Sequence, residues 1–143
     1  MTDENNINTE YPSPMDSPGF RFWQTFLNWQ RRIDVVLAPY DLTQPSFSLL
    51  AISAWLSDES HKATQQRAVR QKIIVEMSRL SKMQVSQLLQ RLSNSGLVTV
   101  EPYELDRRER LIELTEKGWS ILRKTIVLVE ATDREFLSNV RID

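Results

Sequence analysis

Cysteine is absent from the 143-residue chain. Its absence excludes a disulfide framework, a thiolate zinc site, a cysteine nucleophile and a thiol redox sensor. Histidine is nearly absent too, because His61 is the only one and stands in a polar stretch typical of a solvated side chain. Histidine-based metal sites and catalytic triads therefore lack their usual groups. We expect no metal, no cofactor and no enzymatic activity.

Long apolar runs are missing as well. No stretch approaches the roughly 18 residues that a membrane span requires. The opening residues, MTDENNINTEYPSPMD, are polar and acidic, and they lack the basic start and apolar core of a signal peptide. We therefore expect a cytoplasmic protein without membrane association. Because so polar a segment cannot offset its ordering entropy, residues 1–16 are predicted to form a disordered tail.

Glycine is scarce, with only three residues, and no Gly/Ser-rich linker or internal repeat interrupts the chain. The length fits a single domain, here residues 17–143. The overall excess of one charge sign is also small, since the net charge is −1. The charge is unevenly distributed, however: residues 1–42 carry a net −3, whereas residues 61–98 carry a net +6. A basic middle third fits either a localised phosphate contact or an ordinary solvated surface.

Helical periodicity dominates the first half of the chain. Residues 17–38 open with Ser17-Pro18, a cap and first-turn proline. Their apolar residues recur at helical spacing, at Phe22, Trp23, Phe26, Trp29, Ile33, Val36 and Leu37. A second helix should start at Thr43 and stop near Asp58, followed by a long connection or a short extra turn. Trp23, Phe26, Trp29 and Trp55 could line an apolar pocket, although packing explains them equally well.

A helix-turn-helix is predicted over about residues 70–95. A short helix at roughly 70–78 is followed by a second one whose Ser81-x-x-Gln84 start has the form of a capping box. Val85, Leu88, Leu89 and Leu92 give the second helix one apolar face, and Gly96 suits its C-terminal stop. Two helices joined by a turn of about three residues have this motif's form.

A β-hairpin is predicted at about residues 97–114, with the charged bend YELDRR between its strands. Thr115 then caps another helix, and a final short helix is expected from about Asp133 to Asn139. A helix-turn-helix followed at once by a hairpin is a winged helix. The predicted fold is therefore mainly α with a small β-hairpin wing, flanked by terminal helices at about 17–38 and 115–140.

The second helix of the motif presents a polar face without a carboxylate. Major-groove reading needs amide, hydroxyl and guanidinium groups and excludes anions. Ser81 and Lys82, at the helix N-terminus, suit phosphate. The candidate DNA-binding residues of this helix are Ser81, Lys82, Met83, Gln84, Ser86, Gln87, Gln90 and Arg91. The same pattern also fits a surface helix that is merely solvated.

Three arginines and an aspartate mark the hairpin bend: Asp106, Arg107, Arg108 and Arg110. A hairpin tip can reach the minor groove, where the negative potential favours arginine. Asp106 could fix the direction of an arginine or of the backbone. Glu101, Glu104 and Glu109 would then moderate non-specific attraction. A cross-strand ion-pair ladder without any DNA partner is the alternative.

These motifs resemble the MarR family of transcriptional regulators, over about residues 16–140. LSKMQVSQLLQRLSNSGLV matches the family's recognition helix. DRRERLIELTEKG matches its wing, through Asp106, Arg108 and the Leu114-Thr115…Gly118 helix start. The SPGFRFWQTFLNWQRRI segment resembles the first, dimer-forming helix. One departure is Gln87, where many members carry arginine, which favours weaker groove affinity or a more A·T-directed operator.

The resemblance implies a homodimeric winged-helix regulator, in the first instance a repressor, bound to a pseudo-palindromic double-stranded DNA operator. It also implies terminal helices that form the dimer, and a small aromatic effector that releases the protein from DNA. Arg108, held by Asp106, would be the wing contact. The competing interpretation is a winged-helix protein–protein interaction module without specific DNA binding. The lack of acids on the outward face of residues 82–91 favours DNA.

Overall fold

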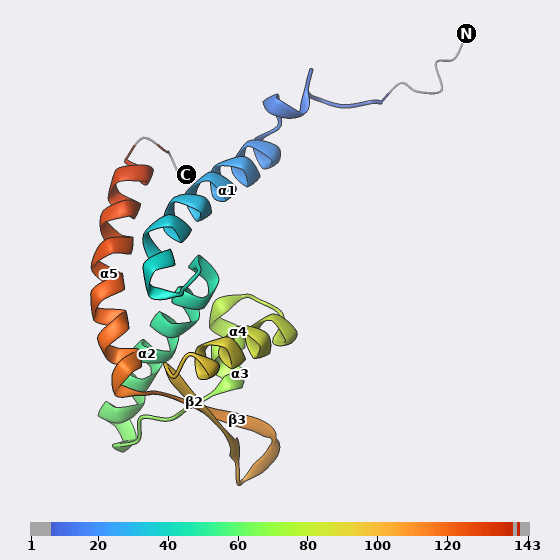
Figure 1. Cartoon of the computed structure of the whole chain (residues 1–143). Helices are drawn as coiled ribbons and strands as arrows, with labels where there is room; N and C mark the ends of the chain where they lie inside the picture. Colours follow the sequence, from blue (N-terminus) through green and yellow to red (C-terminus); the bar gives the residue numbers. More distant parts are fainter. Residues whose placement is uncertain (1–6, 139, 141–143) are drawn as a thin grey trace.

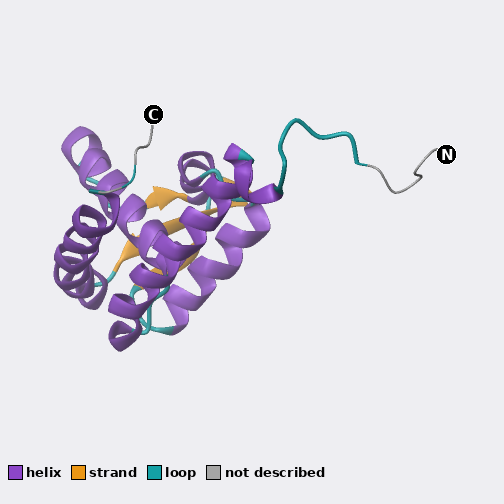
Figure 2. Cartoon of the chain, turned by 90° about the horizontal axis from the view of Figure 1, so that it is seen from above, coloured by secondary structure: helices purple, strands orange, loops and turns teal. Residues whose placement is uncertain are grey.

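The computed structural model describes residues 7–138 and 140, and it places five α-helices and three strands in them. Figure 1 shows the terminal helices α1 and α5 side by side, the helix pair α3 and α4 next to α2, and the strands at the opposite end of the molecule. In the view turned by 90° (Figure 2), the strands lie beneath the helices, and the N-terminal segment runs away from them. The winged-helix fold predicted from the sequence is confirmed.

The two long helices of the N-terminal half begin at their predicted caps. Helix α1 spans Pro18–Leu37 with Ser17 as N-cap, and the 3-10 turn η2 (Ala38–Tyr40) follows it. Helix α2 spans Gln44–Thr64. Its start is a capping box, in which Thr43 Oγ1 accepts from the Ser46 N–H and Ser46 Oγ accepts from the Thr43 N–H. Both partners satisfy amides that the first helical turn leaves free.

The helix-turn-helix consists of α3 (Gln71–Ser78) and α4 (Lys82–Asn94). Arg79 adopts a left-handed conformation in the turn. At the other end of α4, Gly96 has φ +77°, and the Leu97 N–H bonds the Leu92 carbonyl at 2.9 Å. This 6→1 bond is the Schellman pattern, in which glycine tolerates the left-handed position at C′.

The wing sheet has one strand more than the hairpin predicted from the sequence. Strands β2 (Val98–Tyr103) and β3 (Asp106–Leu114) form the antiparallel hairpin. Strand β1 (Val69–Arg70) pairs with the other edge of β3, which gives the order β1-β3-β2. A two-residue strand has no periodicity of its own, so only its distant partner on β3 defines it.

One hydrophobic core joins the helices to the sheet. Its fully buried members come from α1, α2, α3, α4 and β3: Ile33, Leu37, Leu49, Leu50, Ile74, Val85, Leu89, Leu92 and Ile112. The apolar face predicted for α4 is therefore the face that packs inward. Its opposite face is left to solvent, which positions the candidate DNA-binding side chains.

Helix α5 (Glu116–Leu137) is continuous, so the separate short helix expected from Asp133 is wrong, and Asn139 lies outside the described residues. Buried positions at spacings of three and four continue as far as Thr132: Gly118, Leu122, Thr125, Val129 and Thr132. The helix packs on α1. There the Trp29 Nε1–H donates to Asp133 Oδ1 at 2.7 Å, and Arg32 pairs with Glu135 at 3.2 Å.

Two further boundaries differ from the sequence prediction. Helix α2 continues six residues beyond Asp58 to Thr64, where Gln65 closes it in a left-handed conformation. The predicted disordered tail contains a 3-10 turn, η1 (Pro14–Asp16), in which the Asp16 N–H bonds the Ser13 carbonyl. Residues 1–6 of that tail lie outside the described part of the chain. No helix within the described residues is long and apolar enough to cross a membrane.

Candidate nucleic-acid interface

The candidate residues of α4 share one exposed surface. All eight are exposed, and Met83 has 71% of its surface accessible. They comprise Ser81, Lys82, Met83, Gln84, Ser86, Gln87, Gln90 and Arg91. The surface is free of carboxylates, as the sequence indicates, while Val85, Leu89 and Leu92 hold the opposite face in the core.

Two of these residues, Ser81 and Gln84, form a capping box at the start of α4. Ser81 Oγ accepts from the Gln84 N–H, and Gln84 Oε1 accepts from the Ser81 N–H, both at 3.1 Å. Gln84 therefore caps its own helix with its acceptor atom. Farther along, Gln90 Nε2 donates to Asn94 at 3.0 Å. Gln87 is exposed, and its side chain makes no hydrogen bond with the described residues.

At the wing, Asp106 contacts Arg108 as the sequence predicts. Asp106 Oδ1 accepts from the Arg108 N–H at 3.0 Å and lies 3.8 Å from Arg108 Nε. The first contact is an Asx-type bond to the backbone two residues on, which shapes the turn. The Arg108 side chain remains 95% exposed. The expected alternative, a cross-strand ladder of ion pairs, does not occur between described residues of β2 and β3.

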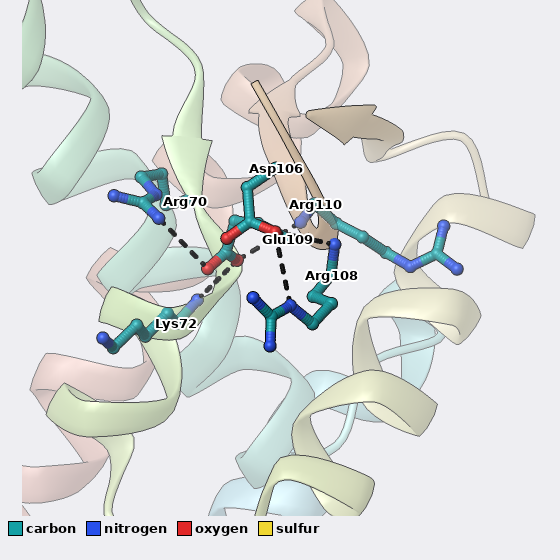
Figure 3. A network of polar contacts seen from close by, with 6 residues as sticks. All are labelled: Arg70, Lys72, Asp106, Arg108, Glu109 and Arg110. Atoms are coloured by element: carbon teal, nitrogen blue, oxygen red, sulfur yellow. Dashed lines mark hydrogen bonds and ion pairs between the residues drawn. The ribbon is translucent and has the colours of Figure 1, made fainter. Parts of the chain in front are cut away.

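Glu109 is placed differently from the sequence expectation. The sequence places it among the exposed acids that moderate attraction to DNA, but only 8% of its surface is accessible. Its Oε1 accepts from the Lys72 N–H at 3.1 Å and from the Arg110 N–H at 3.2 Å. Its Oε2 lies 3.7 Å from Arg70 Nη2. Figure 3 shows these contacts beside the Asp106–Arg108 pair, with the Arg110 guanidinium directed away from both.

A strand irregularity lies next to Glu109. Pro102 pairs with Arg110, but the next residue of β2, Tyr103, pairs with Asp106. Residues 107–109 of β3 therefore have no partner on β2. Such a bulge breaks the two-residue alternation of side chains and re-aims one of them. Glu109 is out of phase with the buried Ile112 and Leu114, and it is buried because it contacts the N-terminal end of α3 through Lys72 and Arg70.

The base of the wing is fastened to α4 and α5 by polar contacts. Thr115 Oγ1 donates to the Gly96 carbonyl at 2.6 Å and accepts from the Gly118 N–H at 3.0 Å. The Thr115 N–H donates to the Leu97 carbonyl at 3.0 Å. Lys117 Nζ donates to the Ser95 carbonyl at 2.9 Å. The end of α4, both strands and the start of α5 thus meet at one junction.

A cleft of about 960 Å³ is lined by residues of α1, α2 and α4. Phe26 of α1, Ile52 of α2 and Leu88 of α4 are among its apolar walls. Gln84, Gln87, Gln90 and Arg91 border it on the recognition side. Of the four aromatic residues that the sequence offered for a pocket, only Phe26 lines this cleft. Trp23 and Trp55 are instead more than half exposed, and Trp29 bonds Asp133.

Across residues 7–138 and 140, no group of three or more histidine, aspartate or glutamate side chains could hold a metal ion. The side chains of this surface offer hydrogen bonds and positive charge. Lys82, Arg91 and the wing arginines supply cations, and the glutamines supply paired donors and acceptors.

Comparisons with known proteins agree with this architecture. The family model described as ArnR1-like, winged-helix domain, matches residues 41–133, more than half of the chain. The HTH-type transcriptional regulator YdcH of Bacillus subtilis (strain 168) is 29% identical over 130 residues, covering 91% of this chain and 84% of YdcH.

Solved structures show the same fold at lower identity. A mutant of MarR from Escherichia coli, complexed with operator DNA, has a TM-score of 0.71 at 21% identity, covering 87% of this chain and 83% of that one. CouR from Rhodococcus jostii RHA1, bound to p-coumaroyl-CoA, also has a TM-score of 0.71 at 21% identity, covering 92% of this chain and 85% of that one. The chain belongs to the ArnR1-like winged-helix family and, as its motifs predict, is a winged-helix transcriptional regulator of the MarR family rather than an enzyme.

Proposed function

We propose that the chain is a sequence-specific DNA-binding repressor that acts as a homodimer on a pseudo-palindromic operator. The observation that carries the proposal is the exposed, carboxylate-free outward face of α4, next to a wing with exposed Arg108. A helix of this kind enters the major groove, while the wing arginines reach the minor groove. The MarR structure with operator DNA supports this use of the fold.

The residue roles follow from chemistry and exposure. Gln87, Gln90 and Arg91 present amide and guanidinium groups that can pair with adenine or guanine edges, and Met83 can meet a thymine methyl. Ser81 and Lys82 lie where phosphate oxygens would approach the helix N-terminus, and Ser86, beyond the first turn, is a further phosphate candidate. Gln84 is assigned a lesser base-reading role, because its acceptor already caps α4. Asp106, Arg107, Arg108 and Arg110 form the proposed wing contact.

The homodimer proposal is supported by α1. Its apolar face is buried near the C-terminal end, at Ile33 and Leu37, but bare near the N-terminal end. There Phe22 is 69% exposed and Phe26 is 40% exposed. Contiguous exposed aromatics of this size mark a protein interface. A two-fold dimer would place two recognition helices about one DNA turn, ~34 Å, apart.

We expect Phe22→Ala to weaken self-association by about 1–2 kcal/mol, the range of an anchoring aromatic at an interface. Size-exclusion chromatography with light scattering over a dilution series measures the change. Asn28→Ala, on the exposed opposite side of α1, is the matched control. Equal self-association of the two variants would remove this face from the dimer.

The cleft beside α4 is the proposed effector site. A ligand there would touch Gln84, Leu88 and Arg91 of the recognition helix itself, so its presence would bear directly on how α4 meets DNA. Phe26 and Ile52 give the cleft apolar walls suited to an aromatic ring. CouR, of the same fold, is bound to an aromatic acyl-CoA. We infer that a small aromatic ligand releases the repressor.

Fluorescence anisotropy tests the function. We expect the purified protein to bind duplex DNA from upstream of its own gene at least about 10³-fold more tightly than a scrambled duplex. The logarithm of affinity should fall with the logarithm of salt concentration, by about 0.9 per phosphate contact. Hydroxybenzoates added in a second series should lower operator affinity.

The competing function is a protein-interaction winged helix. Equal, weak and salt-indifferent binding to both duplexes would favour it, because neither bases nor phosphates would then be recognised. Operator-specific binding that hydroxybenzoates leave unchanged would keep the regulator and reject the proposed effector class. Removal of the gene should raise transcription next to the bound site, and a fall would identify an activator instead.

A further inference from the structure

Glu109 is a buried acid at the edge of a cationic, DNA-facing wing, and its position calls for a physical reason. Burying a carboxylate is unfavourable unless hydrogen bonds and a cation compensate it. The Lys72 and Arg110 N–H groups and the Arg70 guanidinium supply that compensation. We propose that Glu109 is a positioning residue, which fixes the wing arginines relative to the helix-turn-helix by binding the N-terminus of α3.

The contact joins two parts of the chain that are far apart in sequence. Lys72 lies in the first turn of α3, where the free N–H groups and the helix dipole favour a negative charge. Glu109 lies on β3, 37 residues later. Because α3 packs against both α4 and β3, this carboxylate ties the wing to the motif that carries the recognition helix.

Strand β2 of the wing also contacts the N-terminal end of α3, through Arg70. Arg70, the N-cap residue of α3, places its guanidinium 5.3 Å from the centre of the Tyr103 ring on β2. Its other neighbour is Glu109 on β3, at 3.7 Å. Arg70 is therefore held between both strands of the hairpin, by a cation–π contact on one side and a charge on the other.

Glu109 lies within the bulge of the wing, and this location indicates which side chains it would position, namely the wing arginines. Residues 107–109 have no partner on β2, so ladder hydrogen bonds do not order this stretch of the hairpin. Glu109 anchors one end of it, and the Asp106 bond to the Arg108 N–H shapes the other. Ordering these residues before DNA arrives removes an entropic cost from binding. Arg108 and Arg110 then project from a fixed backbone.

Neutralising Glu109 should change operator affinity in opposite directions, depending on whether the residue positions the wing or only repels phosphates. An acid that only repels phosphates would weaken binding, so its neutralisation should strengthen binding. For Glu109→Gln we expect the opposite, an approximately tenfold weaker operator affinity, because wing register is lost. Glu113→Gln is the matched control: it removes the same charge from an exposed position on the same strand, and it should bind at least as tightly as the wild type.

Two further measurements show whether Glu109→Gln weakens binding through lost positioning of the wing or through a smaller amount of folded protein. The salt dependence of Glu109→Gln should become shallower by about 0.9 for each phosphate that the wing no longer neutralises, whereas a smaller folded fraction leaves that slope unchanged. In an Arg108→Ala background, Glu109→Gln should cost little more. Tyr103→Leu leaves both N–H contacts of Glu109 in place and should weaken binding in the same direction, even if Glu109→Gln proves poorly folded.

Hydrogen exchange of the free protein tests the inference without DNA, which matters because the inference rests on the proposed DNA-binding function. Amides of residues 103–110 should exchange faster in Glu109→Gln than in Glu113→Gln, with α4 unchanged. Failure of the wild type to prefer any duplex would reject the function, and unchanged wing exchange would reject the positioning role. Operator binding by Glu109→Gln that equals or exceeds that of Glu113→Gln, or fully additive losses with Arg108→Ala, would also overturn it.

Discussion

Gly118→Ala is expected to lower the free energy of unfolding by about 3 kcal/mol, from overpacking and a broken hydrogen bond. The residue lies in the first turn of α5, where alanine is ordinarily the better helix former by about 1 kcal/mol. The structure reverses this preference, because a Cβ at Gly118 would overlap the Leu97 carbonyl oxygen. That atom is backbone and cannot rotate away.

The overlap would fall on the junction that fastens the wing. The Leu97 carbonyl accepts the Thr115 N–H at 3.0 Å, and Val98 beside it pairs with Leu114 in the first register of the hairpin. Moving Leu97 aside therefore breaks a hydrogen bond and shifts β2 against β3. The damage should spread into the wing rather than remain local to α5.

Chemical denaturation followed by circular dichroism measures the change. Gly19→Ala is the control, since Gly19 lies in the first turn of α1 and no atom would lie within 4 Å of the added Cβ. It should be neutral or stabilising, by up to about 1 kcal/mol. If Gly118→Ala matched Gly19→Ala in stability, the close approach of α5 to Leu97 would be wrong.

Helix starts and stops are the most predictable part of the fold. Thr43, Ser81 and Thr115 each accept an amide three residues later, and Gly96 takes the left-handed stop of α4. These signals are local: a side chain and the backbone a few residues away decide them. The exposed and buried faces of α4 follow equally well from spacing alone.

Features decided by distant partners are not predictable in this way. Strand β1 exists because Val69 and Arg70 pair with Ile112 and Leu111. The extension of α2 to Thr64 runs through a polar segment whose apolar content gives no helical pattern. Continuous burial along α5 removes the expected break near Asp133. The pairing of β1 and the burial along α5 depend on packing that a single segment does not encode, whereas residues 59–64 of α2 are mostly exposed and make local contacts, such as that of Lys62 Nζ with Glu59 at 3.3 Å.

The candidate interface shows the same division. The outward residues of α4 and the Asp106–Arg108 contact are predictable from the sequence, because helix periodicity and an Asx turn are both local. The role of Glu109 is not, since alternation from Ile112 and Leu114 predicts it to be exposed and its partners lie 37 and 39 residues away. The sequence offers one signal for this contact. A glutamate lies within an arginine-rich bend, and a basic segment with which it could pair precedes α3.

Gln87→Glu is expected to weaken operator binding by about 100-fold, roughly 3 kcal/mol. Gln87 is exposed on the outward face of α4, and its side chain makes no hydrogen bond with the described residues. The substitution replaces the NH2 group of the side-chain amide with a carboxylate oxygen. It removes a donor that can pair with a base and places an anion where phosphates and base acceptors would surround it.

Stability should move the other way, which distinguishes a reading defect from a folding defect. Glutamate and glutamine have similar helix propensities, and the new carboxylate would stand four residues before Arg91 on an exposed helix face. Such a pair stabilises a helix by about 0.3 kcal/mol. It would also occupy Arg91, a second groove-facing cation, and so weaken DNA binding further.

Anisotropy on the operator and thermal unfolding of the same samples measure both effects together. Gln66→Glu is the matched control, because it makes the same chemical change at an exposed position in the loop after α2. It lies outside the proposed interface and should bind DNA within about threefold of the wild type, as expected for a distant surface charge that salt screens. Equal affinities of Gln87→Glu and Gln66→Glu would mean that α4 does not read the groove. Weaker binding by Gln87→Glu, with unfolding temperature unchanged or raised, would place the recognition surface on this face of α4.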